Sequence, residues 1–247
     1  MENRADLNKI TIKKLLLCIF TPTAILSLCY LIFGHFWSMP LILLFCILGT
    51  VILVPIELGI ILFASKKEYG SYSLKSAFTG QGKVSVWKTL LIALFFCGLA
   101  GLWSAFVAPL ENKLLEPLRQ ALLSHLPVGF DWQNIDYIKT FPESVILITC
   151  IYYGLFNVII GPVTEELFFR GYLTSHFRIQ NAFTPILITI LFSLYHFWIP
   201  FNNIFRILAF APVAYVAYKT KNIYISICFH CMCNLFSVIG FVIAVVR

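Results

Sequence analysis

Residues 145–177 read VILITCIYYGLFNVIIGPVTEELFFRGYLTSHF, an apolar run that carries two adjacent glutamates and an arginine. A helix needs about 20 mainly apolar residues to cross a bilayer, and this stretch exceeds that length. An ionisable side chain on such a helix is costly in lipid, so Glu165, Glu166 and Arg170 are candidates for a functional site. Glu166 and Arg170 are four residues apart and can pair on one helix face.

The composition of the whole chain is that of a membrane protein. Of its 247 residues, 60% are hydrophobic and 12% are charged, whereas a soluble domain has about 25% charged residues. The chain therefore has too few charges to cover a water-facing surface. Its formal net charge of +7 does not indicate nucleic acid, because the basic residues lie in loops between apolar runs. We expect the lipid bilayer as a partner and no nucleic acid.

Seven apolar runs divide the chain into candidate membrane helices. The predicted spans are Leu15–Phe33, Pro40–Ala64, Leu90–Ala108, Val145–Ile160 with its continuation Glu165–Phe177, Thr184–Ile199, Ile204–Tyr218 and Ile223–Val246. The long connection Pro109–Glu143 is predicted to hold an amphipathic helix near Leu114–Leu126 on a membrane surface. The predicted fold class is all-α, a polytopic membrane helix bundle of about seven transmembrane helices, with six to eight compatible with the pattern.

The distribution of Lys and Arg predicts the orientation. With the N-terminus in the cytoplasm, thirteen of the 18 Lys and Arg residues lie on the inner side, Arg4 and Lys83 among them. The outer side then holds the connection Pro109–Glu143, which is rich in acidic residues, and the terminal Arg247. Because cytoplasmic loops carry an excess of Lys and Arg, we expect the N-terminus inside and the C-terminus outside.

Polar residues recur on two further apolar runs. His196 lies four residues after Phe192, and His230 lies four residues before Asn234, so each pair shares one face of a helix. At about 1.5 Å per residue, Glu165, His196, His230 and Asn234 all lie roughly 12–20 Å from the cytoplasmic ends of their helices. The spacing therefore predicts one site, reached from the cytoplasmic side.

Two other buried charges have no partner at helical spacing. We interpret Glu57 and Arg206 as structural residues, with an accessory role in a pocket left open. A transporter that relays protons through buried carboxylates is disfavoured, because such proteins usually show internal repeats and this sequence shows none.

The candidate residues allow two kinds of hydrolysis. A carboxylate and an imidazole in a dry pocket can deprotonate water, while a second imidazole and a carboxamide donate hydrogen bonds to the developing oxyanion. This route needs no cofactor. Alternatively, Glu165, His196 and His230 hold a divalent metal such as zinc, and metal-bound water attacks. The spacing leaves both routes open.

The three motifs, in this order, resemble the signature of the CAAX protease and bacteriocin-processing family, which includes type II CAAX prenyl endopeptidases and bacterial Abi proteins. They are Glu165-Glu166-x-x-x-Arg170, Phe192-x-x-x-His196 and His230-x-x-x-Asn234. The resemblance covers about Gly161 to Ser237. It implies an intramembrane glutamate-type endopeptidase with a cavity open to the cytosol.

The resemblance also implies a role for each residue. By that likeness, Glu165 and His196 activate the water, His230 and Asn234 form the oxyanion hole, and the remaining charged pair of the first motif supports the site. Residues 141–247 would then be the catalytic core, and residues 1–140 an N-terminal region of three spans and the outer loop.

The family resemblance suggests the substrate class and the location. We expect a peptide or protein substrate near the cytoplasmic membrane surface, in lipidated form or as a bacteriocin or pheromone precursor. The compact chain fits the bacterial relatives, which are linked to bacteriocin maturation and self-immunity, so we expect the bacterial plasma membrane. The alternative is a non-enzymatic immunity or peptide-binding protein that uses the same cavity.

Overall fold

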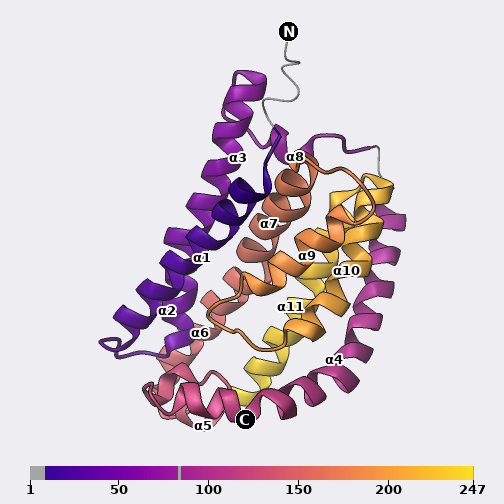
Figure 1. The fold of residues 1–247 in the computed structure, drawn as a ribbon. Helices are drawn as coiled ribbons and strands as arrows, with labels where there is room; N and C mark the ends of the chain where they lie inside the picture. Colours follow the sequence, from indigo (N-terminus) through magenta and orange to yellow (C-terminus); the bar gives the residue numbers. More distant parts are fainter. Residues whose placement is uncertain (1–8, 83–84, 247) are drawn as a thin grey trace.

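The structure, a computed structural model, describes residues 9–82 and 85–246, and it is a bundle of long helices (Figure 1). Three basic residues of the charge count, Arg4, Lys83 and Arg247, lie outside the described residues. Within the described part of the chain there is no strand, only a single β-bridge between Ile10 and Phe177. The predicted all-α membrane bundle is confirmed.

The first half of the chain forms three long helices. The elements are α1 (Ile12–Gly34), α2 (Leu41–Leu48), the π-helical η1 (Gly49–Leu53), α3 (Val54–Tyr69), the 3₁₀ turn η2 (Lys75–Phe78), α4 (Val86–Leu123), the 3₁₀ turn η3 (Val128–Phe130) and α5 (Ile135–Ile138). Local signals set several ends. The Thr11 side chain accepts from the backbone N–H of Lys14 and caps α1, while Gly70, with φ 77°, ends α3.

The second half holds all three sequence motifs. Its elements are α6 (Glu143–Leu155), the π-helical η4 (Phe156–Ile160), α7 (Gly161–Glu166), the π-helical η5 (Leu167–Leu173), α8 (Thr174–His176), α9 (Thr184–Leu194), α10 (Asn203–Thr220) and α11 (Ile223–Val246). The elements from α6 to α8 follow one another without a break, so they form one long, irregular helix.

Five helical runs of the described chain are long and apolar enough to cross a membrane. They are Ile12–Gly34, Leu41–Tyr69, Val86–Leu123, Glu143–His176 and Ile223–Val246. These correspond to the first four predicted spans and the last one. The chain is therefore an integral membrane protein, while the predicted count of seven spans is not confirmed.

The two remaining predicted spans form a hairpin, α9 and α10. The helix predicted over Thr184–Ile199 ends at Leu194, so α9 has 11 residues and is only about 16 Å long. That length is about half of the hydrocarbon core, and α9 cannot cross it alone. The connection between α9 and α10 turns inside the bundle, away from the lower end where the C-terminus lies (Figure 1). His196 therefore lies in this connection, not on a membrane-spanning helix.

Helix α4 is longer than the sequence predicts. The sequence places the end of the span at Ala108 and a separate amphipathic helix after it, whereas α4 continues through Pro109 and Pro117 to Leu123. Proline interrupts the hydrogen bonds of a helix and bends it, and α4 curves from one end of the bundle round to the other (Figure 1). The outer connection is correspondingly shorter.

The bend of α4 brings Glu111 into contact with the start of α10. The Glu111 carboxylate is buried and accepts from the backbone N–H of Ile204 at 3.0 Å and of Phe205 at 2.9 Å. The first residues of a helix have free N–H groups, and its positive end favours a carboxylate. The side chain of the N-cap residue of α10, Asn202, makes no such bond, so Glu111 caps this helix from another element.

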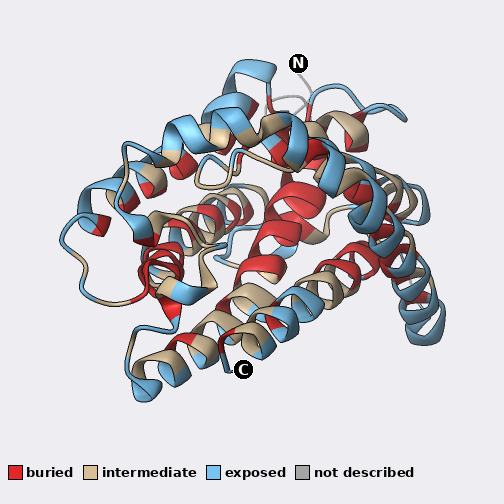
Figure 2. Cartoon of the chain, turned by 90° about the horizontal axis from the view of Figure 1, so that it is seen from below, coloured by how far each residue is buried: buried red, intermediate tan, exposed pale blue. Residues whose placement is uncertain are grey.

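The first motif lies in a continuously buried segment at the centre of the bundle. All residues from Glu165 to Thr174 are buried, and the view from below shows a buried central helix inside a ring of helices with exposed outer faces (Figure 2). Gly171 allows the close packing there, because a Cβ at this position would collide with the backbone oxygen of Ala77.

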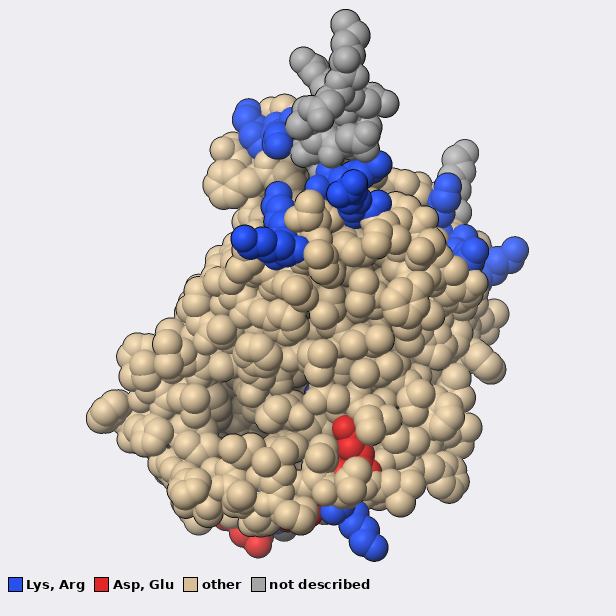
Figure 3. Space-filling view, viewed as in Figure 1, with Lys and Arg blue, Asp and Glu red and all other residues tan. Residues whose placement is uncertain are grey.

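Charge is distributed unevenly over the surface. Lys and Arg gather at the end of the molecule near the N-terminus, and the flank below them is almost without charge on the face shown in Figure 3. This uncharged flank is expected of a surface in contact with lipid.

Candidate active site

The two adjacent glutamates of the first motif occupy an irregular part of the central helix. Glu165 and Glu166 end α7, which lies between the π-helical segments η4 and η5, and Arg170 lies within η5. π-Helical turns are rare and occur frequently at functional sites. The predicted pair nevertheless forms: Arg170 Nη1 lies 3.2 Å from Glu166 Oε1.

Glu166 joins the first motif to the third. Its Oε1 lies 2.9 Å from His230 Nδ1, and its side chain is fully buried. Arg170 compensates the charge of Glu166, and His230 contacts the same carboxylate through its Nδ1 nitrogen. Glu166 and His230 are 64 positions apart in the sequence, yet they are in contact. This agrees with the similar depth in the membrane that the sequence predicts for the first and third motifs.

Glu165 faces the other side of the same imidazole. Glu165 Oε2 lies 3.8 Å from His230 Nε2, and the Glu165 side chain is 11% exposed. This distance exceeds that of a normal hydrogen bond, so the two groups are neighbours without being bonded. Glu165 therefore lies beside a ring whose orientation Glu166 sets, and within reach of the Tyr195 hydroxyl.

Glu57 is the residue whose place in the site the sequence reasoning missed. It lies on α3 with no exposed surface, and its Oε1 accepts a hydrogen bond of 2.8 Å from the Tyr195 hydroxyl. Its carboxylate is close enough to Glu165 for their charges to interact. No pattern within α3 could reveal this, because Tyr195 is 138 residues away; the only signal was a carboxylate in an apolar helix.

Phe192 of the second motif contacts residues of the other two motifs. Its ring centroid lies 4.9 Å from that of His196 and 5.8 Å from that of His230, each in an edge-on arrangement. The Arg170 guanidinium lies over the same ring at 4.2 Å, a distance typical of a cation–π contact. His196 Nδ1 lies 2.8 Å from the backbone oxygen of Phe192, so Nε2 is the ring nitrogen left for other partners.

Arg206 holds the connection that carries His196. Its guanidinium donates to the backbone oxygens of Ser193 at 3.0 Å and Phe201 at 3.5 Å, and to the Asn203 side chain at 3.3 Å. These bonds join both ends of the α9–α10 connection. The structural interpretation of Arg206 therefore agrees with its contacts.

Asn234 is half-buried, and its side-chain amide already has a partner. Its Nδ2 donates to the backbone oxygen of Asn157 at 2.8 Å. Asn157 belongs to the π-helical η4, where the backbone departs from regular α-helical bonding. One N–H of the Asn234 amide is thus occupied, and one remains.

A cavity connects the buried arginine to the basic end of the molecule. It has a volume of about 380 Å³, and its lining includes Arg170, Thr174, Gln180, Lys219 and Lys221. The Arg170 nitrogens form the ion pair with Glu166 without good hydrogen-bond geometry to any protein atom in the described structure. These nitrogens have almost no accessible surface, so the guanidinium borders the cavity and is held mainly by its ion pair with Glu166.

A metal-dependent site would need its possible ligands to lie close together. Among the described residues, no three or more His, Cys, Asp or Glu side chains come together as a metal-binding group. Glu165, His196 and His230, the predicted ligands, thus do not form such a group among the described residues.

Comparison with protein families gives a match for this part of the chain. Residues 147–236 match the family described as type II CAAX prenyl endopeptidase Rce1-like. These residues resemble an Rce1-like domain. The matched region contains all three motifs, so the predicted resemblance to the CAAX protease family is confirmed. It is a family of proteases, which supports an intramembrane endopeptidase. Comparisons with curated proteins and with solved structures found no match.

Proposed function

We propose that this protein is an intramembrane endopeptidase in which Glu165 and His196 activate a water molecule. The observation that carries the proposal is the arrangement of the adjacent glutamates around His230, with Glu166 at 2.9 Å and Glu165 at 3.8 Å. A carboxylate that lies beside an imidazole and is almost fully buried is suited to act as a general base.

The proposed reaction is hydrolysis of a peptide bond. Glu165, assisted by His196 Nε2, takes a proton from water as the water oxygen bonds to the carbonyl carbon. The carbonyl oxygen becomes an oxyanion, and the C–N bond then breaks as the proton passes to the leaving amine. The two products together contain the atoms of the substrate and one water.

His230 and Asn234 are the proposed donors to the oxyanion. With a proton on each nitrogen, His230 donates from Nδ1 to Glu166 and from Nε2 to the oxyanion. The second N–H of the Asn234 amide is the other donor. Donors fixed in position before the reaction stabilise such a charge without reorganisation.

The proposed entry route is the cavity at the basic end, which we assign to the cytoplasmic side. The support is the gathering of Lys and Arg at that end (Figure 3) and the presence of Arg170 in the cavity lining. A small peptide precursor or a lipidated peptide would approach along the membrane surface. From the family resemblance we also propose that the protein lies in a bacterial plasma membrane. Its proposed role there is bacteriocin or pheromone maturation, or self-immunity.

Two variants test the catalytic assignment. The full-length protein in lipid vesicles is offered quenched fluorescent peptides, with and without a lipid group. We expect Glu165→Gln and His196→Ala each to lower the cleavage rate about 10²–10⁴-fold, the usual contribution of a general base. The matched control is Glu143→Gln, because Glu143 is exposed at the start of α6. Cleavage by both site variants at the wild-type rate would overturn the assignment.

The same assay separates the alternatives. We expect a chelator to leave the rate unchanged, whereas loss of activity that zinc restores would favour the metal-dependent route through Glu165, His196 and His230. If the wild-type protein binds these peptides without cutting them, and the two variants bind equally well, the site belongs to a peptide-binding or immunity protein.

A further inference from the structure

A second cavity lies outside the candidate active site, between α1 and α3. Its volume is about 530 Å³, within the range of about 300–1,000 Å³ that is usual for ligand sites. The middle of the cavity is formed by Gly59, Ile60 and Phe63 of α3. These residues lie on a different face of α3 from Glu57, which is directed inward to Tyr195. The cavity is therefore separate from the candidate active site.

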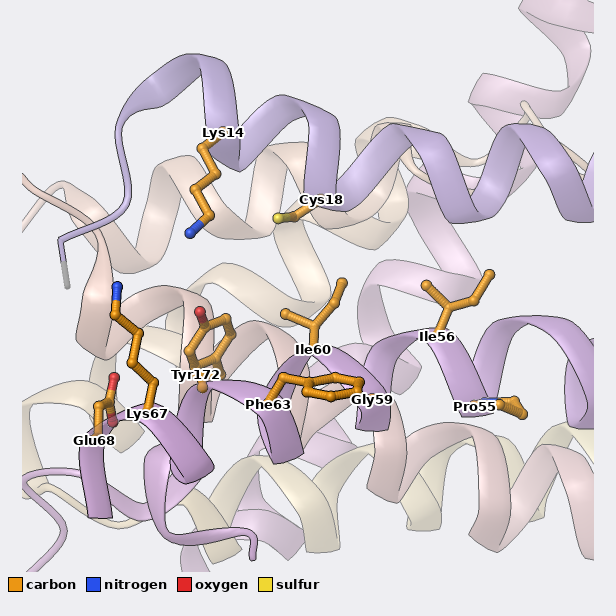
Figure 4. Close-up of a pocket in the computed structure, with 11 residues that line it drawn as sticks. Lys14, Cys18, Pro55, Ile56, Gly59, Ile60, Phe63, Lys67, Glu68 and Tyr172 are labelled. Atoms are coloured by element: carbon orange, nitrogen blue, oxygen red, sulfur yellow. The ribbon is translucent and has the colours of Figure 1, made fainter. Parts of the chain in front are cut away.

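The lining combines an apolar channel with a basic mouth. Figure 4 shows Lys14 of α1 and Lys67 of α3 at one end, with Pro55 and Ile56 at the other. Neither lysine forms an ion pair within the described part of the chain. The acidic residue at this end, Glu68, lies 3.0 Å from His176 Nε2. The mouth is therefore positively charged, and an anionic group fits it.

The length of the channel matches one leaflet of a bilayer. From Pro55 to Lys67, α3 rises about 18 Å at 1.5 Å per residue. The hydrocarbon core is about 30 Å thick, so one leaflet contributes about 15 Å. A molecule with its anionic group at Lys14 and Lys67 would thus place an acyl chain along the channel down to the level of Pro55.

We propose that the groove between α1 and α3 binds an acidic phospholipid of the leaflet at the basic end. The phosphate lies between Lys14 and Lys67, and one acyl chain lies against Ile56, Gly59 and Phe63. A peptide is a poorer occupant, because most lining residues are apolar and their helical backbone groups are already bonded. Basic pockets between membrane helices are known to bind lipid head groups.

Gly59 is the position at which a substitution can block the groove specifically. A Cβ added at Gly59 meets no atom within 4 Å, so a leucine there would fill the channel without a clash at the backbone. Leucine is also a better helix former than glycine. Gly98 of α4 is an exposed glycine whose Cβ is equally free, so Gly98→Leu is the matched control. Lys88→Ala, at an exposed position at the start of α4, is the control for loss of charge.

The experiment measures lipid binding by the full-length protein. Detergent-purified protein is titrated with phosphatidylglycerol or phosphatidylcholine, and bound lipids are counted by native mass spectrometry. We expect phosphatidylglycerol to bind more tightly. Each of Lys14→Ala and Lys67→Ala should weaken its binding about fivefold, Gly59→Leu should abolish binding of that lipid, and both controls should bind as the wild type does. Gly59→Ala should give an intermediate loss, which decides the matter if Gly59→Leu does not fold.

Three results would overturn the proposal. The first is equal binding of the two lipids by the wild type. The second is undiminished binding by folded Gly59→Leu or Gly59→Ala. The third is displacement of phosphatidylglycerol by inorganic phosphate or by an apolar peptide at comparable concentration, which would assign the site to a free anion or to a peptide. Since binding is measured without any substrate, the outcome does not depend on the protease assignment.

Discussion

At the scale of single residues, the hydrogen bond between Tyr195 and Glu57 joins two distant parts of the chain at the candidate site. Tyr195 directly precedes His196, and its hydroxyl donates to Glu57 at 2.8 Å, while the second carboxylate oxygen of Glu57 has no hydrogen-bond partner in the described structure. A buried polar group without its partner costs about 1–3 kcal/mol. The bond therefore fixes the position of the residue next to His196.

Substitutions at this pair distinguish a positioning role from a need for charge. We expect Glu57→Gln to keep an oxygen that accepts from Tyr195, and so to keep most of the cleavage rate. Glu57→Ala leaves the hydroxyl unpaired, and we expect it to lose about 1–3 kcal/mol of stability together with most of the activity. Thermal unfolding and cleavage rates measure the two effects.

The control for this pair is Tyr215→Phe, which removes a hydroxyl from an exposed position on α10. It should leave both measurements unchanged, whereas Tyr195→Phe should resemble Glu57→Ala. If Glu57→Gln were as inactive as Glu57→Ala, the carboxylate charge itself would be required, and the positioning role would be wrong.

At the scale of elements, the α9–α10 hairpin determines where His196 lies. Its connection is held by Arg206 through bonds to Ser193, Phe201 and Asn203. The first turn of α10 is held from α4 by Glu111. The second motif thus depends on contacts made by elements that contain none of the three motifs.

Removing the Glu111 charge should loosen the start of α10. In Glu111→Gln, one of the two carboxylate acceptors becomes a donor, so one backbone N–H of α10 loses its partner and the favourable charge at the helix end is lost. We expect a loss of about 1–2 kcal/mol and faster hydrogen exchange at Ile204 and Phe205. Glu116→Gln on the same helix is the control, since its side chain is 45% exposed. Unchanged exchange in Glu111→Gln would show that the cap contributes little.

At the scale of the whole molecule, the two ends of the bundle differ in charge and the flank between them is apolar (Figure 3). The start of α1 and the end of α11 lie at opposite ends of the bundle (Figure 1), as expected of an odd number of crossings. The α9–α10 hairpin does not change whether the number of crossings is odd or even, because the chain enters and leaves it on the same side.

Reporter fusions test the orientation. We expect alkaline phosphatase fused after the last residue to be active outside the membrane, and a fluorescent protein fused there to stay dark. The same reporters inserted between Gly70 and Lys75, at the basic end, should give the reverse pattern and serve as the control. An active phosphatase at the basic end would invert the orientation, and with it the side from which substrate enters.

Hydropathy and residue spacing alone predicted the membrane class, the three motifs and seven spans, five of which correspond to long apolar helices. These features are local: a run of about 20 apolar residues spans a bilayer whatever its neighbours are, and Glu166 reaches Arg170 because both lie on one helix. Only the tertiary structure decided that α9 stops at Leu194, that α4 continues through Pro109, and that Glu57 meets Tyr195. Such contacts join residues that are far apart in the chain, and their partners are fixed by how the helices pack.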